Sequence, residues 1–276
     1  TISSTTNAPF AVTDAKKAVV ILAKGTQNTL TDPANYVYAD ASTNEPNAAL
    51  FSKADLTIAG EGNLIVKANA NDGIASKDGL VITGGTISVE AVDDGVRGKD
   101  YLVVKGWTWF DSGELNISFQ FMLDHLSSVM VLIVTGVGTL IHVFSTGYMK
   151  EDPGYWKFFS YLNLFMFSML LLILGKNLVV LFVGWEGVGL CSYLLIGFWY
   201  RDMEKAEAGQ KAFIANRVGD LAFLIGTFIL LYYTHGNLDF VSEGGVASAV
   251  QHLTNLPGAA GASGGGDMTL LVVCVL

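Results

Sequence analysis

The sequence GWEGVGLCSYLLIGFW, residues 184–199, places one carboxylate, Glu186, inside an otherwise uncharged apolar segment that begins at Leu178. A charge near the centre of a bilayer costs at least about 2.5 kcal/mol, so such a residue normally faces a protein interior or a water path and is functional by default. The alternative is a protonated Glu186 that hydrogen-bonds a neighbouring helix. The segment therefore predicts a membrane-spanning helix that carries a candidate site.

Three further apolar spans accompany this segment. The predicted spans cover residues 126–144, 158–174, 178–199 and 213–233, each close to the ~20 residues that a membrane helix needs, and another span starts at Met268. Aromatic residues near the span ends are typical of membrane interfaces: Trp156, Trp199, Tyr200, Tyr232 and Tyr233. Residues 107–276 are therefore predicted to form a transmembrane helix bundle.

Basic residues in the loops predict the orientation of the spans, because Lys and Arg in short loops are retained on the cytoplasmic side. The loop between the first two spans has two Lys, and the loop between the third and fourth has Arg201 and two Lys. The intervening loop has only Lys176. The two more basic loops are therefore predicted to be cytoplasmic, which places residues 107–122 and everything before them on the outer side.

Five ordered strings carry a resemblance to a known family. They are WTWFDSGELNISFQFMLDHLS (107–127), VTGVGTLIHVFSTGYM (134–149), FFSYLNLFMFSMLLLIL (158–174), GWEGVGLCSYLLIGFWY (184–200) and KAFIANRVGD (211–220). Residues 107–240 resemble the antiporter-like membrane subunit, called subunit L, of respiratory complex I, the proton-pumping NADH:quinone oxidoreductase. Related sodium/proton antiporter subunits share the fold, but GVGLCSYLLIGF is closer to the complex I branch.

This resemblance implies a fragment of a proton-translocating subunit in the bacterial inner membrane. In the family, a carboxylate on the helix matching residues 178–199 pairs with a lysine on a later, broken helix, and Glu186 matches that carboxylate. The lysine is missing here, so we expect the 276 residues alone to be inactive in proton transport. The subunit is a non-catalytic part of a translocase and is expected to hold no metal or cofactor. NADH, FMN, iron–sulfur clusters and quinone are implied in partner subunits, and the expected partners are other complex I membrane subunits and the lipid bilayer.

Four other residues are candidates for supporting roles. Arg217 and Asp220, at i and i+3 near the start of the fourth predicted span, are predicted to form an ion pair that shapes the field around Glu186. The alternative is a structural anchor at the interface. Asp124 matches a family position, where it caps the first helix or lines a polar entry. For His142, packing is favoured over a proton relay.

The first 106 residues have a different composition and an internal repeat. They contain no His, Cys or Trp and are rich in Gly, Asn, Asp, Thr and Val. NDGIASKDGLVI (71–82) recurs as DDGVRGKDYLVV (93–104), and SKADLTI (52–58) resembles SKDGLVI (76–82). Each repeat is predicted to have two short strands separated by Gly or Asp turns, which is the pattern of a stacked β-solenoid.

Residues 13–106, including LAKGTQNTLTDPANY (22–36), resemble bacterial extracellular proteins described as carbohydrate-binding domain-containing. The resemblance implies a partial right-handed parallel β-helix and a glycan as a ligand. Asp72, Asp93 and Asp94 are expected at turns, where solvated carboxylates are favoured over calcium or sugar ligands.

The chain is therefore predicted to have two parts, a β-helix module at 1–106 and an all-α transmembrane domain at 107–276. We interpret the join at Gly106/Trp107 as an artificial junction of two unrelated genes with no joint function. The rival hypothesis is a membrane-tethered surface protein that binds glycans and uses the helices only as an anchor. The net charge of −9 excludes the basic surface that nucleic-acid binding requires.

Overall fold

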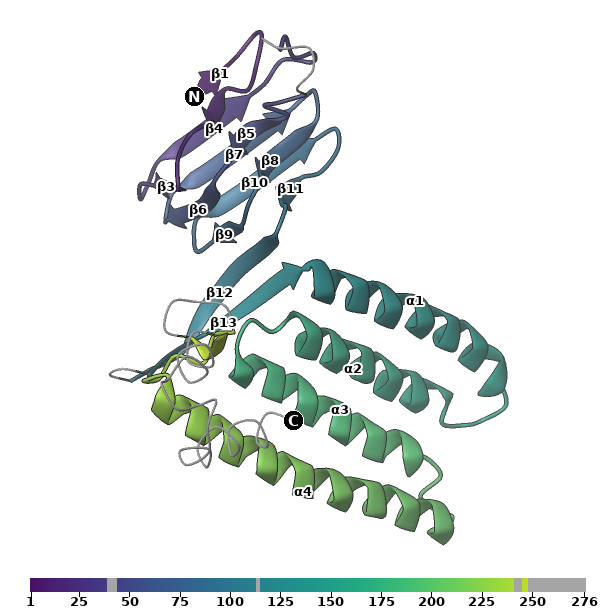
Figure 1. The fold of residues 1–276 in the computed structure, drawn as a ribbon. Helices are drawn as coiled ribbons and strands as arrows, with labels where there is room; N and C mark the ends of the chain where they lie inside the picture. Colours follow the sequence, from purple (N-terminus) through teal and green to yellow (C-terminus); the bar gives the residue numbers. More distant parts are fainter. Residues whose placement is uncertain (39–43, 113–114, 241–244, 248–276) are drawn as a thin grey trace, which may run out of the picture. The chain divides into compact units, whose positions relative to one another are not determined.

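The computed structural model describes residues 1–38, 44–112, 115–240 and 245–247 (Figure 1). The chain divides into two compact units, one made of Thr1–Gly106 with Phe121–Leu126 and the other of Trp107–Gln120 with Ser127–Leu276. The span predicted to start at Met268 lies outside the described residues.

The first unit is built from three parallel sheets. Their orders are β1-β4-β7-β10, β2-β5-β8-β11 and β3-β6-β9-β12-β13. Up to β12, each strand pairs with the third strand before or after it, so coils of three strands stack on one another. This arrangement is consistent with the predicted β-helix. The strands are β1 (Ile2–Ser3), β2 (Phe10–Val12), β3 (Lys17–Leu22), β4 (Gln27–Thr31), β5 (Ala48–Ser52), β6 (Asp55–Gly60), β7 (Asn63–Ala68), β8 (Asp72–Ser76), β9 (Leu80–Ile82), β10 (Thr86–Ala91), β11 (Val96–Gly98), β12 (Tyr101–Ser112) and β13 (Leu115–Asp124).

The strand register explains the sequence repeat. Val96 pairs with Ile74 in β11 and β8, and Leu102 pairs with Leu80 in β12 and β9, so the repeated strings occupy equivalent positions in successive coils. The prediction of two strands per repeat was wrong, because each coil has a third strand. That strand is DGIAS (β8) in one coil and VRG (β11) in the next. The Asp-Gly pair at the start of β8 has the composition of a turn, which is why the strand was not predicted.

Alternating side chains from the coils fill the core of the solenoid. In β7 the inward residues Leu64, Val66 and Ala68 are buried, whereas the equivalent Ile87 and Val89 of β10 are only partly buried. The last complete row of core residues therefore stays partly exposed.

Four apolar helices follow the hairpin β12–β13. They are α1 (His125–Tyr148), α2 (Tyr155–Leu174), α3 (Leu178–Ile196) and α4 (Met203–Tyr233), and all four are long and apolar enough to cross a membrane. Three helix starts agree with the predicted spans within three residues. The fourth helix begins ten residues before its predicted span, at Met203, because the charged stretch from Glu204 to Lys211 is helical as well.

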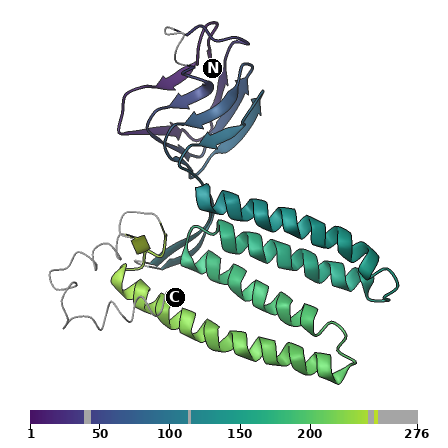
Figure 2. The same cartoon turned by 45° about the vertical axis from the view of Figure 1, so that its right-hand side comes forward.

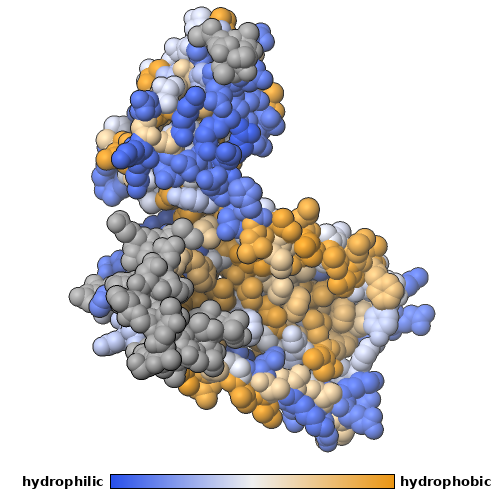
Figure 3. Space-filling view, viewed as in Figure 1, coloured by the Kyte–Doolittle hydropathy of each residue, from blue (hydrophilic) through white to orange (hydrophobic). Residues whose placement is uncertain are grey.

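The exposed faces of the helices are apolar, as membrane-spanning helices require. Hydrophobic side chains cover most of the visible surface of α1, α2 and α3, and hydrophilic side chains gather near the loops that join the helices (Figure 3). In Figures 1 and 2, α3 lies between α2 and α4. The chain is therefore a membrane protein in which α3 contacts a helix on each side.

The loop between α2 and α3 joins three segments at one end of the bundle. Lys176 donates its backbone N–H to Gln120 O of β13 (3.1 Å) and accepts a backbone hydrogen bond from Phe240 (3.1 Å). The Lys176 Nζ also lies 2.8 Å from Asp239 Oδ2. Asn177 caps α3 by accepting from Val180 N (2.9 Å) and donates from Nδ2 to Ser118 O (2.8 Å). We call these contacts the loop junction.

The two more basic loops meet at the opposite helix ends. Trp199, after α3, donates from Nε1 to Asp152 Oδ2 in the loop before α2 (2.8 Å). Phe158 and Phe198 pack edge to face, with ring centroids 5.4 Å apart. These two loops therefore share one end of the bundle, as alternating spans require, and their cytoplasmic location stays a prediction.

Candidate functional site

Glu186 lies on α3 and forms an ion pair with Arg217 of α4, Nη1 to Oε2. The two side chains are 29% and 36% exposed, so neither is fully shielded from its surroundings. In a membrane these surroundings are lipid or protein, where a buried carboxylate is stabilised by a paired cation. Two adjacent helices thus bring together one acid and one base that are 31 residues apart in the chain.

The same guanidinium group also contacts Asp220. Arg217 Nη1 lies 3.2 Å from Asp220 Oδ2, one turn further along α4, so the predicted pair is present. Asp220 is the more buried carboxylate, with a side chain 7% exposed. Arg217 therefore stands between two carboxylates, and it lies well inside α4 because the helix begins at Met203. The alternative of a structural anchor at the membrane interface stays a prediction.

Trp185 completes this cluster and was missed in the sequence analysis. Its indole Nε1–H donates to Asp220 Oδ1 (2.7 Å), which leaves Oδ2 of the same carboxylate toward Arg217. The only available sequence signal was its position beside Glu186, which does not reveal a partner on another helix. We call Glu186, Arg217, Asp220 and Trp185 the carboxylate cluster.

The environment of the Arg217 side chain leaves one donor unused. The guanidinium carbon lies 4.5 Å from the centroid of the Phe213 ring, a cation–π distance. Among the described residues, the buried Nε of Arg217 has no hydrogen-bond partner. The guanidinium is thus held by two carboxylates and one ring.

Glycines beside Glu186 set the spacing of α3 from its neighbours. A Cβ on Gly184 would lie 2.4 Å from Leu172 N of α2, and one on Gly187 would lie 2.4 Å from Ser168 Oγ. A Cβ on Gly189 would instead approach Arg217 Nη2 at 3.7 Å. Two of the three glycines therefore allow close packing on α2, and the third lies beside the Arg217 side chain.

The remaining predicted residues lie outside this cluster. Asp124 is the last residue of β13, is half-buried and directly precedes α1. His142 points its Nδ1 at Gly138 O of its own helix (2.7 Å), a contact that fits a packing role.

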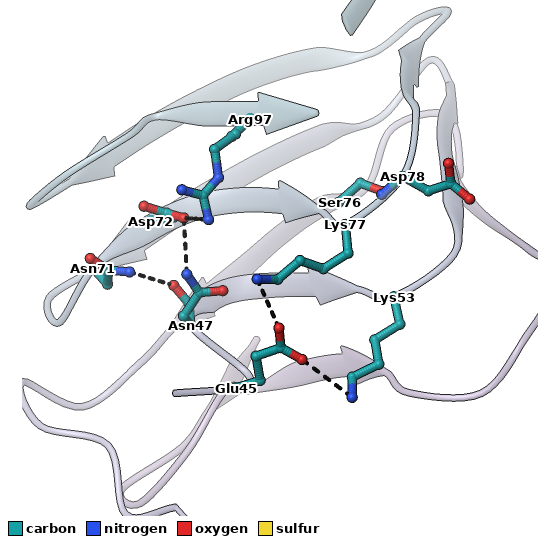
Figure 4. A network of polar contacts seen from close by, with 9 residues as sticks. All are labelled: Glu45, Asn47, Lys53, Asn71, Asp72, Ser76, Lys77, Asp78 and Arg97. Carbon is teal, nitrogen blue, oxygen red and sulfur yellow. Dashed lines mark hydrogen bonds and ion pairs between the residues drawn. The ribbon is translucent and has the colours of Figure 1, made fainter. Parts of the chain in front are cut away.

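A polar network in the solenoid corrects another expectation (Figure 4). Asp72 is not a solvated turn residue: it is fully buried, and its Oδ2 lies 2.7 Å from Arg97 Nη2. Burial raises the pKa of Asp72 above its ordinary value, although Arg97 opposes this effect. Lys77 holds the pKa of the nearby Glu45 below its ordinary value. No group of three or more candidate metal-ligating residues occurs within the described ranges.

The solenoid also has a polar surface pocket of about 400 Å³ near the connection between β4 and β5. Tyr36 and Tyr38 contribute two rings to its lining, with centroids 6.0 Å apart and nearly perpendicular planes. The remaining lining residues are Ala34, Asn35, Asn44, Asn47, Ala70 and Asn71. Amide and aromatic groups of this kind are able to bind an uncharged polar ligand.

Comparisons with known proteins match the two parts of the chain to different families. Residues 1–118 match the model of a carbohydrate-binding domain-containing protein. Residues 109–159 match the model of the complex I chain 5 N-terminus (NADH-ubiquinone oxidoreductase), and residues 175–262 match that of the NADH:quinone oxidoreductase/Mrp antiporter transmembrane domain. Both resemblances stated from the sequence are therefore confirmed.

Curated relatives support the second match. NADH-quinone oxidoreductase subunit L of Mycobacterium tuberculosis is 53% identical over 133 residues, which cover 48% of this chain and 21% of that protein. The Escherichia coli subunit L is 51% identical over 134 residues, covering 49% and 22%. The chain thus spans about a fifth of the length of these relatives.

Among solved structures, a polysaccharide lyase-like protein from C. thermocellum, studied as a gadolinium derivative, is 44% identical to this chain in the aligned part. The alignment covers 35% of this chain and 39% of that protein with a TM-score of 0.34. The stacked coils of the solenoid are defined by its own strand pairing.

Proposed function

We propose that the helical part of this chain is a fragment of the proton-translocating membrane subunit of an NADH:quinone oxidoreductase. In this proposal, Glu186 takes up and releases protons on the proton path through the subunit. Support comes from the similarity to subunit L over about 133 residues. The observation that carries the proposal is the ion pair between Glu186 and Arg217 on adjacent apolar helices. A mere anchor has no need of a carboxylate inside a membrane span.

The carboxylate cluster suggests how this chain's residues act. A nearby cation favours the charged form of a carboxylate, and its removal favours protonation. Arg217 contacts both Glu186 and Asp220, so a shift of the guanidinium toward Asp220 leaves Glu186 without its cation. A proton then binds Glu186, and return of Arg217 expels it.

Partner subunits supply the redox chemistry in this proposal. NADH, FMN, iron–sulfur clusters and quinone are assigned to those subunits, and no step of the proton transfer above uses them. The subunit is placed in the bacterial inner membrane beside other complex I membrane subunits.

The test is Glu186→Gln in the complete subunit, within the assembled complex. Glutamine keeps the size of the side chain but cannot carry the charge, so proton pumping is expected to fall more than NADH oxidation. Proton uptake per electron is measured in vesicles with a pH-sensitive dye. The matched control is Glu207→Gln, which removes an exposed carboxylate from the polar start of α4. An unchanged proton-to-electron ratio and rate in Glu186→Gln would refute the proposal.

A second candidate function belongs to the solenoid and is favoured by its polar pocket. We infer that Tyr38 and the asparagine amides bind a neutral glycan, in line with the family model that residues 1–118 match. Tyr38→Ala is expected to abolish binding on a glycan array, with Tyr101→Ala, which does not line this pocket, as the control. Binding that is unchanged in Glu186→Gln would support the rival function, and an array without signal would exclude it for the glycans displayed.

A further inference from the structure

A pocket of about 610 Å³ lies at the end of the bundle where the two more basic loops meet. Its lining combines three cations, two acids and several rings: Asp152, Pro153, Gly154, Trp156, Lys157, Phe198, Trp199, Tyr200, Arg201, Asp202 and Lys205. Helix ends of a membrane bundle lie at the level of the lipid headgroups, where Trp and Tyr accumulate. The pocket therefore lies where headgroup phosphates are found.

The charges in this pocket are unequally satisfied. Asp152 accepts hydrogen bonds from Trp199 Nε1 (2.8 Å) and Gly154 N (2.7 Å). These bonds lower the pKa of Asp152, and both of its carboxylate oxygens already have a donor. Lys205 forms an ion pair with Asp202 at 3.2 Å. Arg201 has no ion-pair partner among the residues that the structure describes. One guanidinium at the rim is therefore available to an external anion.

Aromatic rings position the second available cation. The Lys157 Nζ lies 5.8 Å from the Trp156 centroid and 5.7 Å from that of Tyr200, and it too has no ion pair in the described parts of the chain. Cation–π contacts leave ammonium hydrogens free to donate to a phosphate. The Phe198 side chain, 8% exposed, supplies an apolar wall that suits an acyl or glycerol group.

We propose that this pocket binds the phosphate headgroup of an anionic glycerophospholipid, with Arg201 and Lys157 as the phosphate ligands and Trp156 and Tyr200 against the glycerol region. The lipid is favoured over free phosphate because the site joins cations to apolar and aromatic surface at a helix end. This inference depends on the bundle spanning a membrane and not on proton transfer by Glu186.

The test uses the full chain in phosphatidylcholine vesicles that contain brominated phosphatidylglycerol or, as the reference, brominated phosphatidylcholine. Bromine quenches nearby tryptophan, so the background chain carries Phe in place of the three other tryptophans, and Trp156 and Trp199 report occupation of the pocket. The expected result is stronger quenching by the anionic lipid. Arg201→Gln and Lys157→Gln are each expected to lower the relative association constant about five-fold, as about 1 kcal/mol per basic residue near an anionic surface implies.

Two control variants distinguish the effect of a charge in the pocket from the effect of any charge in these loops and from the effect of a misfolded pocket. Lys150→Gln removes an exposed cation from the same pair of loops without touching the pocket lining and is expected to leave the preference unchanged. Arg201→Lys retains the charge and is expected to retain the preference. Equal quenching by the two lipids in the unmodified chain would overturn the proposal. So would a preference that survives the double substitution, or one that millimolar inorganic phosphate abolishes.

Discussion

At the scale of single residues, the carboxylate cluster shows how much a side chain depends on partners from another helix. The sequence correctly singled out Glu186 as an acid in an apolar span, and it paired Arg217 with Asp220 by helical spacing. It did not reveal that Arg217 also reaches Glu186, since no spacing rule relates residues on different helices. Only the packing of α3 on α4 brings them together.

Gly184 provides a test of close helix packing. Gly184→Ala is expected to lower the free energy of unfolding by about 1–3 kcal/mol relative to Gly136→Ala, because its Cβ would lie 2.4 Å from the backbone of Leu172. A Cβ on Gly136 meets nothing within 4 Å, so both variants share the gain in helix propensity but only one clashes. Unfolding in mixed detergent micelles measures the difference. Equal stability of the two variants would contradict close packing at Gly184.

Asp72 provides a test of pH dependence in the solenoid. Burial raises its pKa in the folded chain, so the folded state keeps this proton to a higher pH than the unfolded state does. The stability that Asp72 contributes is therefore lost as the pH rises above the ordinary value of 3.8. Relative to the unmodified chain, Asp72→Asn is expected to become more stable as the pH rises through this window.

That trend is measured by urea unfolding of the full chain, monitored with a probe attached to the solenoid. Asp93→Asn, at an exposed position, is the control and is expected to stay within about 0.5 kcal/mol of the unmodified chain at each pH. A stability difference for Asp72→Asn that falls as the pH rises would show that the ion pair with Arg97 outweighs burial.

At the scale of elements, the loop junction links the hairpin β12–β13 to the start of α3. Asn177 has two roles there: its Oδ1 caps α3, and its Nδ2 bonds to Ser118 O of β13. An Asn side chain at this position accepts from an amide of the first helical turn, which is a common N-cap. The bond to the hairpin could not be foreseen, because Ser118 lies 59 residues away.

Two substitutions separate the roles of Asn177. Asn177→Ser keeps a capping oxygen but is too short to reach Ser118, so hydrogen exchange is expected to accelerate at the hairpin amides and not in the first turn of α3. Asn177→Ala is expected to accelerate exchange at both places and to cost about 1 kcal/mol for the lost cap. Hydrogen exchange with mass spectrometry of the full chain measures both. Unchanged hairpin exchange in both variants would show that the Asn177–Ser118 bond stabilises nothing.

At the scale of the whole molecule, two units with different chemistry share one chain. The solenoid is a stack of short parallel strands, whereas the second unit presents four apolar helices, and each resembles a different family. The strand β12 runs through the predicted boundary at Gly106 without a break. The backbone of this strand therefore does not show the change that the composition shows clearly.

The junction itself is open to a direct test. We expect amplification and long-read sequencing across the codons for Lys99 to Leu115 from the source material to fail, with each flank recovered in a longer gene of its own. Primers placed wholly within either flank are the control for template quality. An unbroken product would contradict an artificial junction and would require a joint function for the two units.

Properties that act along the chain were readable without a structure. Apolar length indicated four membrane spans, alternation and repeats indicated stacked coils, and the strand register bears out the repeat. Properties that depend on distance between remote segments were decided by tertiary packing alone. These are the Arg217 contact of Glu186, the indole bond to Asp220, the burial of Asp72 and the third strand of each coil. The physical reason is that local composition determines which segments leave water, whereas ion pairing and desolvation depend on which neighbours they meet when packed.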